Sequence, residues 1–147
     1  MDDSYSDVGE LRLVVTSVSS DSHTWNLVYL QLLLEEMGHQ VTNLGACVPE
    51  SLLVDRCRDI SPDLVVMSSV NGHGWTDGAR AVRALHAVPE LARTPAIIGG
   101  KLSIDGPLGA ELRESLLDAG FDEVFADDAR PGALADYLAT VRRRQAV

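Results

Sequence analysis

Short apolar runs alternate with segments of helical periodicity along nearly the whole chain, and this alternation is the feature that most constrains the fold. The first run, Leu11 to Val18, is rich in β-branched residues, as is typical of a strand buried on both faces. Apolar residues then recur at helical spacing from Leu27 to Met37, and Gly38 follows as a favoured helix cap. Strands are expected at residues 11–18, 40–44, 64–68, 95–98 and 123–125, and helices at residues 27–37, 49–60, 77–87, 108–119 and 131–144.

Strict alternation of strand and helix predicts a parallel sheet with right-handed crossovers and helices on both faces. Five units most naturally give an α/β fold of the flavodoxin-like (Rossmann-like) type, with strand order 2-1-3-4-5. A length of 147 residues fits one domain. We expect a flexible N-terminal arm over residues 1–10 and a single domain over residues 11–147.

Composition and charge exclude several classes of partner. The formal net charge of −10 would repel a phosphate backbone, and the one basic run, Arg142 to Arg144, lies where the last helix is expected to end. The apolar runs are too short to span a bilayer, and the N-terminus is acidic. Cys47 and Cys57 lack the spacing of a metal or redox motif. The sequence predicts a cytoplasmic protein that binds neither nucleic acid nor a membrane.

Polar and glycine residues gather in the loops that follow three of the predicted strands. In an open parallel sheet, ligands bind outside the carboxyl ends of the strands, at the switch point between strands 1 and 3. The loops after strands 1, 3 and 4 are therefore the expected site. Its candidate residues are Ser20, Asp21, Ser22, His23, Thr24, Trp25 and Asn26 in the first loop, Ser68, Ser69, Val70 and Gly72 in the second, and Gly99, Gly100 and Lys101 in the third.

Asp21 and His23 form an Asp-x-His pair in the first of these loops. At this spacing the carboxylate can turn back to accept the Nδ1 hydrogen, which leaves Nε2 free as a metal ligand. An alternative interpretation is that Asp21 or Asn26 only caps the following helix. The spacing alone leaves both interpretations open.

Glycine pairs occur in two of the other loops. Gly99 and Gly100 are expected directly after a strand, where they would let a flat ligand approach the backbone. A glycine pair can equally begin a turn, and the same alternative applies to Gly72 and Gly74 around His73.

Three segments together resemble a known family. The runs VTSVSSDSHTWN, VVMSSVNGHGWTDG and AIIGGKLSIDG are similar to the Asp-x-His-x-x-Gly, Ser-x-Leu and Gly-Gly motifs of cobalamin (B12)-binding domains. Within that family the chain resembles most the small subunits of glutamate mutase, also called methylaspartate mutase. The resemblance covers the chain from Leu11 onward.

The resemblance implies a role for each matching residue. In this family the dimethylbenzimidazole base of the cofactor is displaced from cobalt, and the motif histidine takes its place. His23 would therefore ligate the cobalt and Asp21 would orient it. Ser68 would bond to the nucleotide tail, Val70 would pack on it, and the glycine pair 99–100 would leave room for the benzimidazole.

The chain departs from the family motifs at two positions. Val70 stands in place of leucine, which is a mild change of shape. Asn26 stands in place of glycine and adds a side chain where the family makes room for the tail, so glycine at this position is expected to tighten cobalamin binding. The neighbouring Trp25 would either flank the corrin ring or close the crevice as part of the core.

The resemblance also implies an activity. The chain would be the cobalamin-binding subunit of an adenosylcobalamin-dependent carbon-skeleton mutase, hence part of an isomerase, in a hetero-oligomer with a larger barrel-type subunit that carries the substrate pocket. The alternatives are a corrinoid methyl carrier of a methyltransferase system and a cofactor-binding module that has lost mutase function. Methyl carriers normally have a helical bundle before the cobalamin fold.

Classes without cobalamin are less consistent with the residues. A phospho-receiver needs an aspartate at the end of strand 3, where this chain has Ser68 and Ser69. In a flavin carrier, Asp21 would repel the phosphate. A pure interaction module remains possible, as does a zinc site formed by His23, His73 and Cys47, although their spacing matches no zinc signature.

Overall fold

The computed structural model describes residues 9–102, 109–126 and 132–146. Residues 1–8 of the predicted arm (1–10) lie outside the described residues. So do residues 108 and 131, the predicted first residues of the last two helices. The elements are β1 (Arg12–Thr16), α2 (Trp25–Glu36), β2 (Gln40–Asn43), α3 (Glu50–Ile60), β3 (Leu64–Ser68), α4 (Gly74–His86), the 3-10 helix η1 (Pro89–Leu91), β4 (Ala96–Gly100), α5 (Ala110–Ala119), β5 (Glu123–Ala126) and α6 (Ala133–Ala146).

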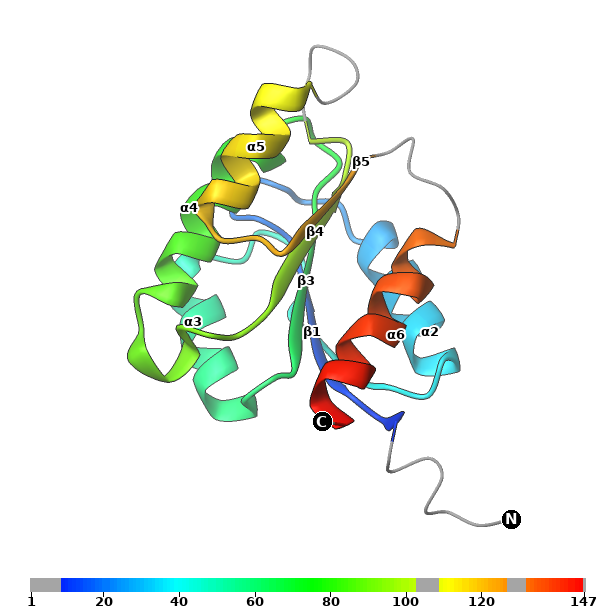
Figure 1. Ribbon diagram of the computed structural model, residues 1–147. Helices are drawn as coiled ribbons and strands as arrows, with labels where there is room; N and C mark the ends of the chain where they lie inside the picture. The colour runs from blue at the N-terminus through cyan, green and yellow to red at the C-terminus, as the bar shows by residue number, and fades with distance from the viewer. Residues whose placement is uncertain (1–8, 103–108, 127–131, 147) are drawn as a thin grey trace, which may run out of the picture.

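The five strands form one parallel sheet in the order β2-β1-β3-β4-β5, which confirms the predicted flavodoxin-like topology. Helices α3, α4 and α5 cover one face of the sheet, and α2 and α6 cover the other (Figure 1). The chain order reverses between β1 and β3, so the loops after these two strands meet at the switch point.

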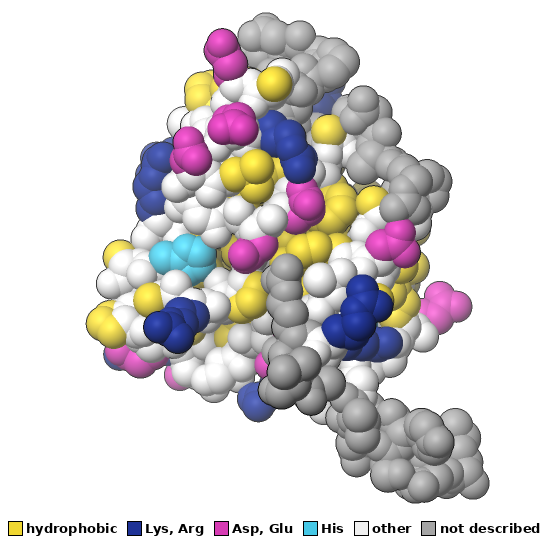
Figure 2. All heavy atoms as spheres, viewed as in Figure 1, with side chains coloured by type: hydrophobic (Ala, Val, Ile, Leu, Met, Phe, Trp, Pro, Cys, Tyr) yellow, Lys and Arg dark blue, Asp and Glu magenta, His cyan; other side chains and the backbone are white. Residues whose placement is uncertain are grey.

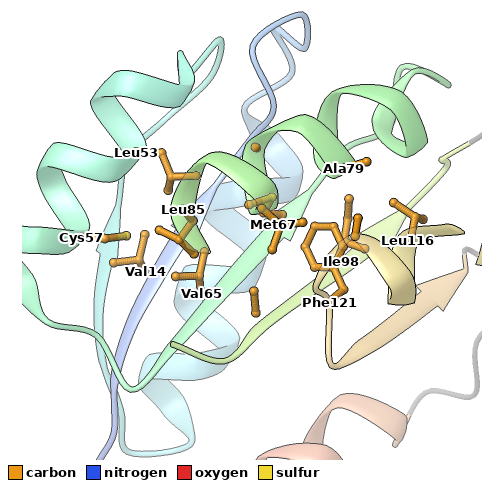
Figure 3. Close-up of a cluster of buried hydrophobic side chains, with 14 of the residues drawn as sticks. Val14, Leu53, Cys57, Val65, Met67, Ala79, Leu85, Ile98, Leu116 and Phe121 are labelled. Carbon is orange, nitrogen blue, oxygen red and sulfur yellow. The ribbon is translucent and has the colours of Figure 1, made fainter. Parts of the chain in front are cut away.

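The two faces of the sheet hold separate apolar cores because successive strand residues point to opposite sides. Val14 and Val65 pack with Leu53 in the core under α3, α4 and α5 (Figure 3). Leu13 and Val66 belong to the other core, under α2 and α6. Each large apolar side chain that is fully buried contributes ~1.5–3 kcal/mol. The double-sided burial explains why the strands lack polar alternation.

Two helices begin earlier than predicted. Helix α2 begins at Trp25, and α4 begins at Gly74 instead of near Asp77. A Cβ atom at Gly74 would lie 2.8 Å from side-chain atoms of Ser69 and Leu102. Gly74 is thus a helical residue selected by close packing, which the low helix propensity of glycine conceals in the sequence. The short helix η1 had no counterpart in the prediction.

Strand β4 continues through Gly100 instead of ending at Ile98. Gly99 pairs with Phe125, and Gly100 pairs with Ala126 of β5. The prediction that the glycine pair follows the strand is therefore wrong, because both glycines form its last two residues. Glycine is disfavoured in strands, so propensity ended the predicted strand too early.

The surface over α5 is acidic. Figure 2 shows acidic side chains gathered in this region, where Glu111, Glu114 and Asp118 are exposed. Such a surface disfavours contact with a polyanion. Within the described residues, none of the helices combines the length and the apolar character needed to cross a bilayer.

Candidate functional site

The carboxylate of Asp21 joins the loop after β1 to the loop after β3. Asp21 is fully buried. One of its oxygens, Oδ1, accepts the backbone N–H of His23 at 3.0 Å. The other, Oδ2, accepts the backbone N–H of Val70 at 2.8 Å and the hydroxyl of Ser69 at 3.1 Å. The side chain is therefore held at both oxygens by groups from the loops that follow two neighbouring strands of the sheet.

These hydrogen bonds decide the charge of Asp21. Burial raises the pKa of its carboxyl, but hydrogen bonds from the backbone of His23 and Val70 and from the side chains of His23 and Ser69 lower it, and the net pKa lies below the ordinary value. Asp21 is consequently a carboxylate at neutral pH.

His23 is oriented by this carboxylate. Its Nδ1 lies 2.7 Å from Oδ1 of Asp21, and its side chain is 58% exposed. A ring nitrogen facing a carboxylate carries the proton, so the lone pair of the imidazole lies on Nε2. This arrangement holds the imidazole in one orientation, with Nε2 on the side of the ring away from Asp21.

The alternative interpretation, in which Asp21 or Asn26 caps the next helix, is wrong. The cap residue of α2 is Thr24, and no side chain makes a capping hydrogen bond there. Asp21 instead bonds to its own loop and to the loop after β3.

A second set of hydrogen bonds ties the first loop to α4. Ser20 donates its hydroxyl to Asp77, which is buried in the first turn of that helix. Asn71 donates to the backbone oxygen of Ser20 at 3.2 Å. The side-chain oxygen of Asn71 lies 3.1 Å from the Ser69 hydroxyl, and this hydroxyl also bonds to Asp21. Sequence analysis did not select Asn71 or Asp77.

An apolar cavity of about 370 Å³ lies beside this loop, between the sheet and helices α2 and α6. Its apolar walls include Leu30, Leu33, Val66, Ile97, Phe125 and Leu134, and its polar side chains are Asn26, Tyr29 and Ser68. None of the residues that line it is charged. Cavities of this size bind flat or drug-sized molecules.

The two glycines of β4 serve different purposes. Gly99 lines the cavity, and a Cβ atom there would lie 3.2 Å from the backbone oxygen of Phe125. Gly100 has a φ of +114°, and its Cβ atom would lie 2.2 Å from the backbone oxygen of Ser69. Both glycines line the cavity, but the missing side chain at Gly100 also makes room for the neighbouring loop, whereas that at Gly99 makes room for the neighbouring strand β5.

Asn26 and Ser68 meet at the cavity. Nδ2 of Asn26 donates to Oγ of Ser68 at 2.8 Å. Oδ1 of Asn26 is buried and accepts no hydrogen bond from any residue that the structure describes. The asparagine therefore carries one satisfied and one unsatisfied polar group at the wall.

Several predicted site residues lie away from this cluster. Trp25 is 84% exposed, so the interpretation that it closes the crevice as core is wrong. Ser22, Thr24 and Lys101 are also exposed. Gly72 is buried in the second loop, and its N–H donates to the backbone oxygen of Lys101 at 3.2 Å, which joins the loops after β3 and β4.

The suggested zinc site is not formed. Among the described residues there is no group of three or more histidine, cysteine, aspartate or glutamate side chains that could hold a metal ion. His73 and Cys47 are both exposed, and Cys47 is a free thiol.

The fold and the site together define a class of protein: a flavodoxin-like sheet that presents a carboxylate-oriented histidine at its switch point, next to an apolar cavity. Residues 11–131 match the family described as B12 binding domain, and the chain belongs to that family. It is 29% identical over 128 residues to the glutamate mutase sigma subunit of Halobacterium salinarum, covering 87% of this chain and 85% of that one.

Two solved structures illustrate how far the likeness extends. A cobalamin-binding protein from Desulfitobacterium hafniense DCB-2 superposes with a TM-score of 0.69 at 25% identity, over 91% of this chain and 58% of that chain's length. A Francisella response regulator receiver domain superposes equally well, with a TM-score of 0.69, over 92% of this chain and 98% of that one, but at 16% identity. The second likeness is one of fold alone.

Proposed function

We propose that this chain is the cobalamin-binding subunit of an adenosylcobalamin-dependent carbon-skeleton mutase of the glutamate mutase type, and thus part of an isomerase. The observation that carries the proposal is the His23–Asp21 pair, with Nδ1 held 2.7 Å from a fully buried carboxylate and the imidazole exposed beside an apolar cavity. Similarity to glutamate mutase sigma subunits supports the mutase assignment.

His23 would ligate cobalt through Nε2. Asp21 accepts the Nδ1 proton and so increases the basicity of the ligating nitrogen. Since the carboxylate is locked by Ser69 and Val70, the imidazole keeps its orientation whether or not a cofactor is bound. When bound, adenosylcobalamin supplies radical chemistry through homolysis of its cobalt–carbon bond.

The apolar cavity would take the nucleotide tail of the cofactor. A flat aromatic base fits walls made by Leu33, Ile97 and Phe125, and the bare wall at Gly99 lets the ring approach the strand. Ser68 supplies a hydroxyl at the same wall. The residues present therefore fit a corrinoid whose base has been displaced from cobalt by His23.

The substrate pocket would lie on a separate, larger barrel-type subunit. None of the residues that line the cavity is charged, so the described site has no cation to bind a substrate carboxylate there. The chain would thus act in a hetero-oligomer, with the cofactor on one subunit and the substrate on the other. Two free cysteines support a location in the reducing cytoplasm. We propose that the domain spans residues 11–147 and that the chain alone has no turnover.

Binding and turnover test the proposal separately. Equilibrium dialysis of the purified chain against adenosylcobalamin should show saturable binding, and the bound cofactor should have the absorption spectrum of a form whose own base is displaced. Mutase activity should appear only after a glutamate mutase barrel subunit is added. Failure to retain any corrinoid would contradict the assignment, as would conversion of glutamate to methylaspartate by the chain alone.

A further inference from the structure

Asp77 is a buried carboxylate outside the set of residues proposed to hold the cofactor. It lies in the first turn of α4, where an acidic side chain can stabilise a helix through its dipole without any specific partner. Asp77 does have specific partners at both oxygens. Oδ2 accepts the hydroxyl of Ser20, and Oδ1 pairs with the guanidinium group of Arg80. The carboxylate therefore joins α4 to the loop after β1.

Arg80 extends this network to α3. Its Nε atom lies 3.3 Å from Oε1 of Glu50, so one guanidinium group pairs with two carboxylates. The Arg80 side chain is 58% exposed, and ion pairs in contact with solvent add little stability by themselves. Their effect here is geometric, because Arg80 occupies one oxygen of Asp77 and leaves the other for Ser20.

Ser20 is held from two sides. Its hydroxyl donates to Asp77 and accepts Nδ2 of Asn71 at 3.0 Å. The same Asn71 nitrogen lies 3.2 Å from the backbone oxygen of Ser20. Ser20 directly precedes Asp21, whose carboxylate orients His23. The anchoring of Ser20 thus fixes the chain at the point where it enters the Asp-x-His segment.

We propose that Asp77 is a positioning residue of the cofactor site: through Ser20 it orders the loop that carries Asp21 and His23 before a ligand binds. The inference rests on the proposed function, because it takes His23 as the cobalt ligand. An ordered ligand group loses less conformational entropy on binding. Residues that support a metal ligand from outside its coordination shell contribute to affinity in this way.

The free chain should show the effect of this anchor directly. Removing the Asp77 carboxylate releases Ser20 on one side, so the loop opens more often. Each opening breaks the bonds that the backbone N–H groups of His23 and Val70 donate to Asp21. Loss of one charge-assisted hydrogen bond corresponds to about tenfold in the opening equilibrium. We therefore expect both amide hydrogens to exchange about tenfold faster in Asp77→Ala.

The first experiment measures amide exchange and imidazole nitrogen-15 shifts by nuclear magnetic resonance in the intact chain without cofactor. Asp77→Ala and Ser20→Ala should each speed exchange at His23 and Val70 about tenfold and lower the fraction of His23 that carries its proton on Nδ1. The double variant should match Ser20→Ala alone, because both changes remove the same bond. Asp77→Asn keeps an acceptor for the Ser20 hydroxyl and should restore most of the protection.

The second experiment measures adenosylcobalamin binding by equilibrium dialysis. Asp77→Ala and Ser20→Ala should weaken binding about tenfold, and Asp77→Asn should weaken it less. Ser19→Ala is the matched control, because the exposed Ser19 hydroxyl makes no hydrogen bond within the described residues. If Asp77→Ala loses global stability in urea, Ser20→Ala at its exposed position decides the outcome.

Three results would overturn the inference: unchanged exchange and imidazole shifts in Ser20→Ala, additive effects in the double variant, or unchanged affinity in both single variants. Each of these leaves the proposed function intact as long as the unmodified chain binds adenosylcobalamin. If the unmodified chain binds no corrinoid, the proposed function is rejected, and with it the part of Asp77 in positioning a cobalt ligand.

Discussion

The Nδ1 atom of His23 lies 2.7 Å from Oδ1 of Asp21, and this contact joins an exposed imidazole to a fully buried carboxylate. The two residues differ in exposure because the chain turns outward within two positions. Asp21 uses its remaining oxygen on the loop after β3, so the imidazole is oriented by the sheet itself. If His23 ligates cobalt as proposed, little conformational entropy is lost on binding, because the side chain is already ordered.

The first prediction concerns the cobalt ligand. Bound cob(II)alamin in protein labelled with nitrogen-15 histidine should show coupling of one imidazole nitrogen to cobalt in electron paramagnetic resonance. The coupling should disappear in His23→Ala and persist in His73→Ala, because His73 is exposed on the second loop and has no orienting carboxylate among the described residues. A signal that survives in His23→Ala would show that another group ligates the metal.

The second prediction concerns Asp21. Its removal leaves the imidazole in place but takes away its orienting partner, and loss of such a partner typically weakens a metal site about 10 to 100-fold. Asp21→Ala should therefore weaken cobalamin binding, but less than His23→Ala does. Asp55→Ala on the exposed side of α3 serves as the control and should bind normally. An unchanged affinity in Asp21→Ala would show that the Asp21 carboxylate does not contribute to cobalamin binding.

The third prediction compares the stability effect of alanine at Gly100, which is tightly packed, with that at Gly109, which is not. Gly100→Ala should destabilise the fold by ~2–4 kcal/mol, since its φ of +114° is unfavourable for alanine and the new Cβ would meet the Ser69 backbone at 2.2 Å. Gly109→Ala, at the cap of α5, has a φ of −72°, and no atom of the described residues beyond its chain neighbours lies within 4 Å of the new Cβ. It should change stability by less than ~1 kcal/mol. Urea unfolding would measure both, and equal effects would contradict the packing argument.

The sequence predicted those parts of the site that depend on neighbours along the chain. The strand order and the Asp21–His23 pair followed from local periodicity and a spacing of two residues. The bonds from Asp21 to Val70 and from Ser20 to Asp77 join positions far apart in the sequence. No local pattern marks such partners, because they become neighbours only when β1 and β3 pair.

Glycine and asparagine positions show a second limit of prediction from the sequence. Propensity treats Gly74 and Gly100 as breaks, yet Gly74 is the first residue of α4 and Gly100 is the last residue of β4. At both positions a close approach excludes any side chain. Asn26 stood out only as a possible helix cap and as a departure from a motif. Its bond to Ser68 and its unsatisfied oxygen depend on how α2 packs on the sheet, which residue spacing does not specify.

The last prediction concerns His39, which is buried at the start of β2 and accepts the backbone N–H of Leu11 at Nδ1, 3.2 Å away. Burial lowers the pKa of His39, the nearby charge of Arg142 lowers it further, and Glu10 opposes the shift, with a net pKa below the ordinary 6.5. Between the folded and unfolded pKa values the unfolded chain binds more protons, so stability falls as the pH decreases from about 6.5 through the folded pKa.

Urea unfolding at pH 7.5 and at pH 5 should therefore show a loss of stability in the unmodified chain that is smaller in His39→Gln. Glutamine keeps hydrogen-bonding groups but does not titrate. The low pKa of Asp21 acts at more acidic values, below about its ordinary 3.8, and so does not contribute in this window. His73→Gln, at an exposed position, is the matched control variant. If His39→Gln and the unmodified chain lose stability equally, the buried histidine is not the group that responds to pH.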